Sequence, residues 1–377
     1  MKILINTAST FKGGGVQVAY SFIEECKNYP EHQYHIVLGT TIGKMIKRDT
    51  FPQNFRFYKI GYRPATKVFS IKGAGVFFKE LEAKVKPDVV FTTSGPAYWR
   101  PRAPHLAGYN LPHYIYTDSP FISSLPLLRQ LKWKIKGAFI KYFFKRDADA
   151  YVVQTDDVNQ RLRAYLGTDK VYTVTNTFSS KYLNPKQVDD KLPARQQDEF
   201  RMLTLSAWYQ HKNIGIIKPV IDILLQRGIA NIRFVLTLPD EVYTEHFPEK
   251  YRAYIYNVGV VKIDEAPALY KECDVMFLPT LLECFSASYA EAMKMDVPIL
   301  TSDMGFAHTV CKDAAVYFNP IDPADIADKI IQLTASEDLR KSLVAKGKET
   351  LKNFGSADVR AKKYLELLKQ LADGGKD

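Results

Sequence analysis

Short apolar strands alternate with amphipathic helical stretches along almost the whole sequence, and this pattern constrains the fold more than any other feature. Such an alternation is typical of βα units, whose strands form a parallel sheet. Strands are predicted at 2–6, 35–38, 55–59, 88–92, 151–154 and 171–175, and again at 201–206, 232–237, 257–261, 274–278, 297–301 and 315–318. A polar stretch separates the two series. The sequence therefore predicts an α/β protein with domains at 1–180 and 200–355 and a linker at 181–199.

Open parallel sheets bind ligands at the carboxyl ends of their strands. Two such domains are therefore expected to face each other across a cleft that holds the ligand.

Positive charge is concentrated in the first half of the chain. Residues 1–180 contain 26 Lys and Arg against 13 Asp and Glu, whereas the remaining residues contain 26 against 28. An excess of this size fits an anionic partner such as nucleic acid, acidic lipid or a phosphorylated substrate, although a solvated basic surface would look the same.

Several classes of protein are disfavoured by the sequence. Its apolar runs are far shorter than the roughly 20 residues that span a bilayer, and the first residues lack the features of a secretory signal. The four cysteines are too far apart for a zinc or redox pair and too few for a disulfide scaffold. We therefore expect a cytoplasmic protein without a bound metal.

Three consecutive glycines, Gly13, Gly14 and Gly15, follow the first predicted strand and precede a helix predicted over 16–28. Their amides could approach a phosphate or a sugar without an intervening side chain, although a flexible turn would need no more. A dinucleotide fingerprint would require glycine at Val18, so an NAD enzyme is not expected.

The most informative stretch runs from Leu278 to Met293. A strand ends at Leu278, a loop carries Glu283, and Ser286 is placed to cap a helix that carries Glu291. The amides at such a helix start suit a diphosphate, and each carboxylate suits the hydroxyl pairs of a sugar. Lys212, after the first strand of the second series, could supply a neutralising cation.

This series of motifs resembles the donor-binding half of the retaining family 4 glycosyltransferases, which have the GT-B fold. The matching features are Glu283 and Glu291 eight positions apart and then, in order, Met293, Val297-Pro298, Ser302-Asp303, Gly305, Asp313-Ala314-Ala315 and Asn319-Pro320. The resemblance implies two Rossmann-like domains and a last helix, at 356–377 with the tail, that crosses back to the first domain. Its predicted apolar stripe is Val359, Tyr364, Leu367, Leu368 and Leu371.

The resemblance also implies roles for individual residues. Glu291 would bind the ribose, Glu283 the donor sugar, and the amides of Phe285, Ser286 and Ala287 the diphosphate. Lys212 would neutralise the leaving nucleoside diphosphate, with the loop of Gly13 to Gly15 closing over it, and no metal would be required. Backbone groups around Val260 would contact the base.

Two departures from the family pattern concern the phosphate site. The family usually has an arginine where this chain has Ala207, and glycines where it has Cys284 and Ser286. Lys212 would then offset more of the diphosphate charge, unless His211 or Arg102 replaces the arginine.

Two further motifs have more than one interpretation. His113, near Asn110 on a loop expected on the acceptor side, could position or deprotonate the acceptor hydroxyl, or it could simply be a packing residue. Asp147 and Asp149 imitate a metal-binding pair but precede a strand, so helix termination is the expected role.

A basic helix is predicted from 127 to 146, with seven Lys and Arg and no acidic residue. One apolar face, with Leu128, Leu131, Ile135, Ala138, Phe139 and Tyr142, is expected to pack on the domain core. The opposite stripe is predicted to contact an anionic membrane, and comprises Trp133, Ile140 and Phe144 with Lys134, Lys136, Lys141 and Lys145 beside it. Burial of the helix on both sides is the alternative.

The predicted function is the metal-independent transfer of a sugar, with retention, from a nucleoside-diphosphate sugar to a hydroxyl of a lipid-linked or cell-envelope polysaccharide acceptor. The protein is expected at the inner face of the cytoplasmic membrane. A nucleotide-sugar epimerase of the same fold is one alternative, and a basic nucleic-acid-binding protein is another.

Overall fold

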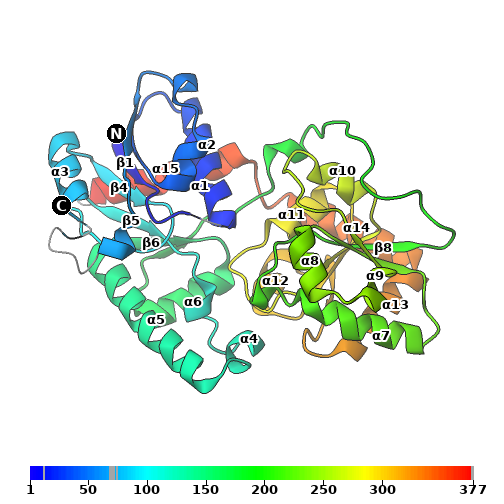
Figure 1. Cartoon of the computed structure of the whole chain (residues 1–377). Helices are drawn as coiled ribbons and strands as arrows, with labels where there is room; N and C mark the ends of the chain where they lie inside the picture. Colours follow the sequence, from blue (N-terminus) through cyan, green and yellow to red (C-terminus); the bar gives the residue numbers. More distant parts are fainter. Residues whose placement is uncertain (12, 68–72, 74, 375–377) are drawn as a thin grey trace. The chain divides into compact units, whose positions relative to one another are not determined.

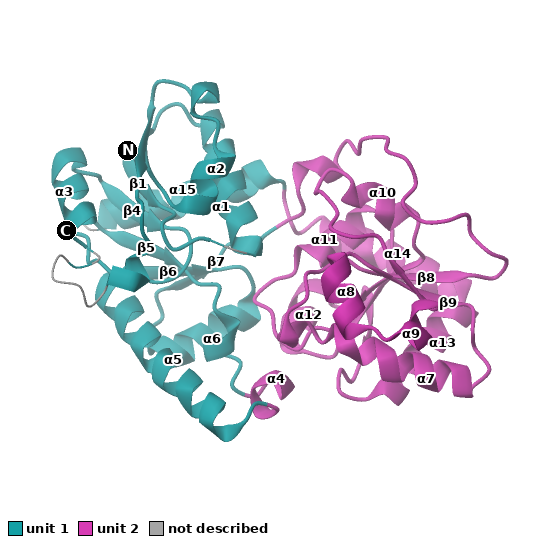
Figure 2. Cartoon of the chain, viewed as in Figure 1, with its two compact units in different colours: residues 1–117, 125–176, 356–377 teal, residues 118–124, 177–355 magenta. Residues whose placement is uncertain are grey.

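The computed structural model describes residues 1–377 apart from 12, 68–72, 74 and 375–377. The chain forms two compact units (Figure 2). Unit 1 comprises residues 1–117, 125–176 and 356–377, and unit 2 comprises residues 118–124 and 177–355. The last three residues of the predicted tail lie outside the described residues.

Unit 1 contains a seven-stranded parallel sheet in the order β3-β2-β1-β4-β5-β6-β7 (Figure 1). The strands are β1 (Lys2–Asn6), β2 (Gln33–Leu38), β3 (Phe55–Lys59), β4 (Val89–Thr92), β5 (His105–Gly108), β6 (Ala150–Val153) and β7 (Val171–Thr173). The longer helices are α1 (Gly14–Glu25), α2 (Thr40–Met45), α3 (Val76–Val85), α5 (Leu127–Asp147), α6 (Asp156–Leu166) and α15 (Ala357–Gly374). Ile3 on β1 pairs with Tyr34 on β2 and Val89 on β4, which makes β1 a central strand.

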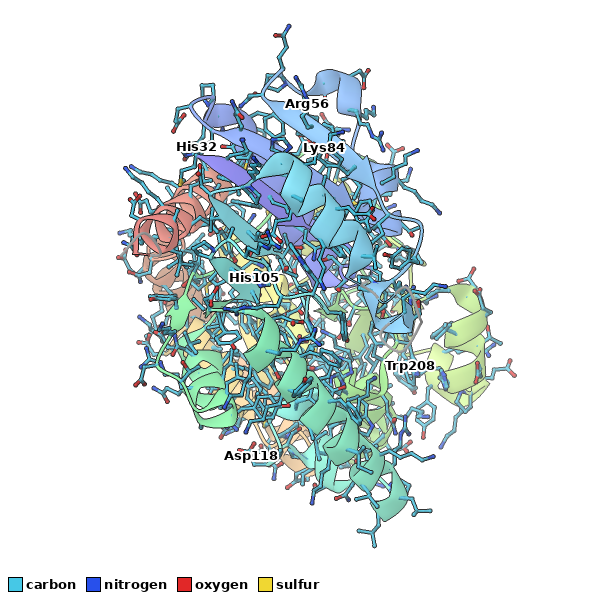
Figure 3. The ribbon with its side chains drawn as sticks, turned by 90° about the vertical axis from the view of Figure 1, so that its left-hand side faces the viewer. His32, Arg56, Lys84, His105, Asp118 and Trp208 are labelled. Carbon is cyan, nitrogen blue, oxygen red and sulfur yellow. The ribbon has the colours of Figure 1, made fainter. Side chains whose placement is uncertain are left out.

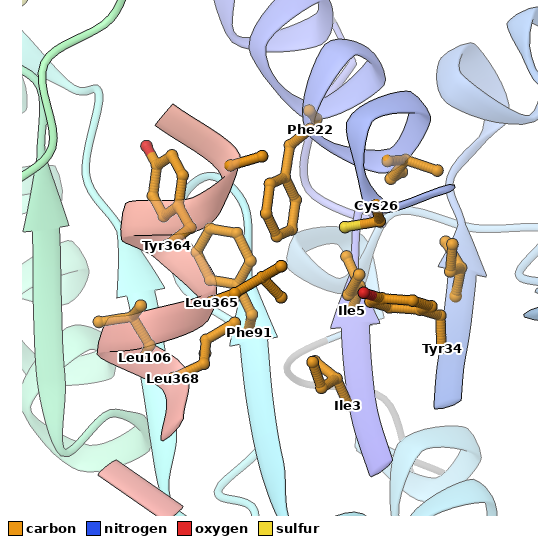
Figure 4. Packing of buried hydrophobic residues seen from close by; sticks show 14 of the residues in the cluster. Ile3, Ile5, Phe22, Cys26, Tyr34, Phe91, Leu106, Tyr364, Leu365 and Leu368 are labelled. Atoms are coloured by element: carbon orange, nitrogen blue, oxygen red, sulfur yellow. The ribbon is translucent and has the colours of Figure 1, made fainter. Parts of the chain in front are cut away.

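The C-terminal helix α15 completes one face of the unit 1 sheet (Figure 4). Its buried residues Tyr364, Leu365 and Leu368 join a core that includes Phe22 from α1 and Phe91 from β4. The Phe91 ring lies 5.4 Å from Phe22 and 5.3 Å from Tyr364, measured between ring centroids. The apolar stripe of this helix is therefore buried by unit 1.

The start of α15 has a polar attachment as well. Arg360 is buried and donates hydrogen bonds to Asn176 and, at 2.8 Å, to Ser21. Val359, predicted as part of the stripe, is instead exposed, and Ala361 and Leu365 are buried in addition to the predicted residues. The stripe lies slightly further round the helix than the sequence indicates.

Unit 2 repeats the same topology with a six-stranded parallel sheet in the order β10-β9-β8-β11-β12-β13. The strands are β8 (Phe200–Thr204), β9 (Ile232–Leu236), β10 (Ile255–Asn257), β11 (Val275–Leu278), β12 (Ile299–Ser302) and β13 (Ala315–Phe318). The helices are α4 (Pro120–Ser123), α7 (Ile217–Gln226), α8 (Asp240–His246), α9 (Glu249–Arg252), α10 (Ala266–Lys271), α11 (Ala287–Lys294), α12 (Gly305–Cys311), α13 (Pro323–Ala335) and α14 (Glu337–Leu351).

Each unit therefore has the strand order of a doubly wound Rossmann sheet, as predicted. The chain reverses direction across the sheet between β1 and β4 in unit 1 and between β8 and β11 in unit 2. Loops that leave the carboxyl ends of two such strands diverge, and this point is where ligands bind to open α/β sheets. The predicted α/β class with two Rossmann-like halves is confirmed.

Some predicted elements are misplaced. Strand β5 was missed, and the strand predicted at 257–261 ends at Asn257, so Val260 lies on the following loop and is exposed. The polar stretch at 181–199 is part of unit 2, where it contributes the buried side chains of Tyr182 and Leu192. Segment 118–124, expected in the first domain, also belongs to unit 2.

The prediction for the two faces of α5 is wrong. Ile140 and Phe144, expected to be exposed, are buried, and Trp133 is half-buried. The face expected to pack on the core is exposed, at Leu128, Leu131, Ile135, Ala138, Phe139 and Tyr142. Both faces are apolar, so the helical period alone could not identify the buried one. No described helix has an apolar stretch long enough to cross a membrane.

Candidate active site in unit 2

Two loops of unit 2 leave the sheet at the point where the chain reverses. The loop after β8 carries Lys212, and the loop after β11 carries Glu283. They are joined by a 2.8 Å hydrogen bond from the Leu281 amide to the His211 carbonyl. The hydroxyl of Thr280 donates to the same carbonyl at 3.3 Å. Parallel strands β8 and β11 are neighbours, so these two loops come together although they are about 70 residues apart in sequence.

Lys212 and Glu283 form an ion pair. Their side chains are 17% and 12% exposed, and the Thr280 hydroxyl also donates to Glu283 at 3.3 Å. A lysine held in this way is largely shielded from water, which strengthens its attraction for any anion that reaches it. A diphosphate carries more charge than one carboxylate and could therefore compete with Glu283 for the ammonium group.

Helix α11 begins directly after this loop. Ser286 is at the N-cap, as predicted, but its side chain makes no capping hydrogen bond, contrary to expectation. The amides in the first turn of a helix have no acceptor within the helix. The backbone amides of Ser286 and Ala287, next to half-buried Phe285, can therefore donate hydrogen bonds to a negatively charged group.

Glu291 lies one turn further along α11 and is buried. Tyr270 donates a hydrogen bond to its carboxylate at 3.4 Å, and Tyr182 interacts with the same carboxylate. Burial raises the pKa of Glu291 to about 7, although the two tyrosines partly oppose this rise. This carboxylate can thus accept a hydrogen bond from a sugar hydroxyl, but it would have to ionise in a site that favours the protonated form.

The two tyrosines were not predicted. Tyr270 is on α10 and Tyr182 is in the stretch interpreted as a linker, and their rings lie 6.0 Å apart. Both are buried. No local motif marks a tyrosine that will donate to a carboxylate more than 20 residues away.

Segment 118–124 was also missed as a part of this unit. Ser119 donates from its hydroxyl to the carbonyl of Leu281 at 2.7 Å, and Phe121 contacts the ring of His211 edge to face at 5.9 Å. Both residues are buried. The segment therefore supports the same two loops that carry Lys212 and Glu283.

Val260, predicted to contact the base, lies in unit 2 on the exposed loop after β10. The other predicted site residues lie in unit 1. Gly13 precedes α1 with a φ of 73°, which favours glycine, and Gly14 and Gly15 form the first turn. A Cβ added to Gly15 would lie 2.6 Å from the side-chain amide nitrogen of Asn110. The side-chain oxygen of Asn110 accepts a 2.7 Å hydrogen bond from the Ser94 hydroxyl. This glycine is therefore explained by close packing, and it lines a small pocket of unit 1 with Asn110 and Gln154.

His113 is stacked on Trp133 of α5, with 4.5 Å between ring centroids. Its ring is therefore part of the contact between α5 and the rest of unit 1. This position supports the alternative that His113 is a packing residue.

The acidic pair at the end of α5 makes structural contacts. Asp147 is buried beside Arg146, and Asp149 binds Arg100 and the amide of His105. Within the described part of the chain, no three His, Cys, Asp or Glu side chains are grouped so that they could hold a metal ion. The four cysteines are buried and unbridged.

Sequence comparisons identify the second half of the chain. Residues 190–350 match the family described as Glycosyl transferases group 1. An uncharacterized glycosyltransferase of Methanocaldococcus jannaschii is 26% identical over 239 residues, which are 59% of this chain and 60% of that relative. The matched region thus spans about three fifths of the relative's length.

Structural comparisons cover nearly the whole chain. Sucrose-phosphate synthase from Thermosynechococcus elongatus has a TM-score of 0.77 at 16% identity, over 99% of this chain and 100% of that one. Anabaena HepE, solved in complex with UDP-glucose, has a TM-score of 0.70 at 14% identity, over 98% and 100%. At such identities the likeness establishes a shared fold. The chain thus has the two-domain GT-B fold, and residues 190–350 in its second half match a group 1 glycosyl transferase domain.

Proposed function

We propose that this enzyme transfers a sugar from a nucleoside-diphosphate sugar to an acceptor hydroxyl with retention of configuration. The observation that carries the proposal is the Lys212–Glu283 ion pair beside the start of α11, with buried Glu291 on the same helix. Anabaena HepE has been solved with UDP and with UDP-glucose, so UDP-sugars are the first donors to test.

Each part of this site has a task in the reaction. The bond between the anomeric carbon and the diphosphate breaks, and its electron pair leaves with the diphosphate. Lys212 and the first amides of α11 stabilise the charge that develops there. Glu283 holds the sugar, Glu291 holds the ribose, and the backbone around Val260 contacts the base. The acceptor oxygen then bonds to the same face of the carbon, and its proton passes to a phosphate oxygen.

No metal ion is required in this scheme, because a lysine and a helix start supply the positive charge that a divalent cation would otherwise supply. The proposed acceptor is a hydroxyl on a lipid-linked carrier or a cell-envelope polysaccharide, at the inner face of the cytoplasmic membrane. The excess of basic residues in 1–180 supports an anionic surface as the place of reaction.

The test is a thermal-shift series with UDP, GDP, ADP and their sugars. A ligand at 100 times its dissociation constant stabilises a protein by about 2.7 kcal/mol, which is readily measured. The preferred nucleotide should then support transfer to a hydroxyl acceptor. Lack of stabilisation by every nucleotide would contradict the proposal, and conversion of the sugar to its epimer without acceptor would identify an epimerase instead.

A further inference from the structure

The outer face of α5 is the largest gathering of exposed apolar side chains in the described part of the chain. We define this face as Leu127, Leu128, Leu131, Ile135, Phe139 and Tyr142, which are 52% to 82% exposed. They account for six of the fifteen large hydrophobic residues that are exposed among the described residues. Single exposed apolar residues are common on proteins, but a contiguous stripe marks an interaction surface.

The inner face of the same helix packs against the rest of unit 1. Trp133 stacks on His113, Phe143 lies 4.9 Å from Tyr98, and Phe144 lies 5.1 Å from Tyr109. At Gly137 the helix approaches so closely that an added Cβ would lie 3.1 Å from the ring of Tyr114. The helix is therefore anchored through one face, and Figures 1 and 3 show it along the outside of unit 1.

Basic residues border the outer face on both sides. At 100° per residue, Lys132 and Lys136 lie along one edge, and Lys134, Lys141 and Lys145 lie along the other. The single acidic residue of α5, Asp147, is buried at its end and paired with Arg146. The stripe from Leu127 to Tyr142 is about 24 Å long at 1.5 Å per residue. Uncompensated positive charge thus flanks the apolar stripe along its length.

We propose that the outer face of α5 binds the surface of an anionic lipid bilayer. A helix with this pattern lies in the plane of the membrane, with its apolar residues among the upper acyl chains and its lysines at the lipid headgroups. An anionic bilayer offers apolar depth and dense negative charge together, which matches both features of this face. A second copy of the chain would bring lysines against lysines, and a nucleic acid would leave six large apolar side chains in water.

This inference deepens the proposed function, because a lipid-linked acceptor would be met at the same surface. It does not depend on the donor site for its test, since vesicle binding needs neither donor nor acceptor. If the protein fails to bind vesicles but is still stabilised by a nucleotide, the proposed membrane surface is wrong and the proposed donor site is unaffected.

Vesicle flotation tests the proposal directly. The full chain is expected to float with vesicles of equal parts phosphatidylcholine and phosphatidylglycerol, to remain unbound with pure phosphatidylcholine, and to be released by high salt. The variant Leu131→Ser/Ile135→Ser/Phe139→Ser should lose binding while staying folded, because all three side chains are exposed. Its matched control, Leu183→Ser/Ile321→Ser, removes exposed apolar residues from unit 2 and should bind like the wild type.

A second pair of variants tests the charges. Lys134→Glu/Lys145→Glu should weaken binding by at least about 25-fold, at roughly 5-fold for each basic residue near an anionic surface. Lys79→Glu/Lys84→Glu makes the same change of charge on α3 and should have a much smaller effect. Equal binding by the wild type and the Leu131/Ile135/Phe139 variant would overturn the proposal. Self-association or oligonucleotide binding that this variant abolishes, without vesicle binding, would overturn it too.

The native cysteines allow an independent measurement. All four are buried, so a cysteine introduced by Ile135→Cys can be labelled selectively with an environment-sensitive fluorophore. Its emission should shift to the blue when anionic vesicles are added, whereas a label at Lys84→Cys should not respond. No shift at position 135 in the presence of bound vesicles would show that another surface makes the contact.

Discussion

The two units have the same strand order, yet the points where their chains reverse carry very different chemistry. In unit 2 this point brings together Lys212 and Glu283, next to buried Glu291. In unit 1 the corresponding loops carry the glycines before α1 and the neutral Ser94, whose hydroxyl donates to Asn110 on the loop after β5. The family match covers 190–350 and none of unit 1 before it. A shared fold thus specifies where a ligand can bind, and the side chains placed there determine what kind of ligand it is.

The largest expected effect tests whether catalysis depends on the Lys212–Glu283 ion pair of unit 2. Lys212→Ala/Glu283→Ala should reduce kcat/KM for transfer by about 10² to 10³ or more, the loss typical of removing transition-state charge stabilisation. Steady-state kinetics measures this. The matched control is Lys341→Ala/Glu337→Ala, which removes an exposed ion pair from α14 of the same unit and should leave kcat/KM unchanged. Near wild-type turnover by the first variant would mean that the active site lies elsewhere.

The next effect tests whether the two cores are independent. Leu368→Ala empties space in the core of unit 1 and should lower the free energy of unfolding by about 2–5 kcal/mol. Hydrogen exchange should speed up in β1 and β4. Leu224→Ala, the matched change in the core of unit 2, should instead speed up exchange in β8 and β9. Stabilisation by the preferred nucleotide should survive Leu368→Ala, and its loss would argue against a donor site confined to unit 2.

A smaller, pH-dependent effect concerns Glu291. Its pKa of about 7 in the folded protein lies above the ordinary value of 4.5, so the folded state holds a proton that the unfolded state releases. The contribution of Glu291 to stability is therefore fully present below pH about 4.5 and is lost as the pH rises to about 7. Glu291→Gln cannot titrate, so its stability relative to the wild type should increase over this interval by up to about 3 kcal/mol. Thermal melts across this range measure the difference, and a difference independent of pH would contradict the assignment.

The same residue should make nucleotide binding depend on pH. If the ionised carboxylate accepts the ribose hydroxyls, wild-type affinity should rise as the pH increases through about 7. Isothermal titration of Glu291→Gln should give weaker binding with a flatter pH profile. Equal affinity and an equal profile would exclude a direct contact with the ribose.

The smallest expected effect is none at all. Treatment with a chelator should leave the transfer rate unchanged, because the lysine and the helix start supply the positive charge at the diphosphate. Activity that requires an added divalent cation would contradict this part of the proposal. The Lys341→Ala/Glu337→Ala variant, treated in parallel, controls for non-specific effects of the chelator.

The sequence predicts the parts of this structure that depend on local patterns. Buried parallel strands are continuous apolar runs, and β1 and β13 are placed without error for this reason. The four-residue β5 contains His105 and Gly108, so it lacks such a run and was missed. Lys212 and Glu283 were predicted as members of one site because each follows a strand, and the structure brings them together.

What the sequence could not supply depends on distant contacts. The tyrosines that interact with Glu291 come from positions 182 and 270. The faces of α5 are both apolar, and only the position of His113 and Tyr98 in the folded chain determines which face is covered. The apolar stripe of α15 was recognisable, but the exposure of Val359 depends on how the helix is turned against α1.

The division of the chain between the two units limits how its sequence can be rearranged. Ser119, which donates to Leu281 beside the proposed active site, lies more than 50 residues before the main part of unit 2 in the sequence, and α15 of unit 1 follows that part. A fragment that starts at residue 177 would therefore lack Ser119, whose hydroxyl holds the Leu281 loop. A fragment that ends at residue 176 would lack α15, which covers one face of the unit 1 core. Exchange of unit 2 between relatives requires coordinated replacement of the 118–124 segment and retention of the last helix, so recombination at a single junction would produce neither unit intact.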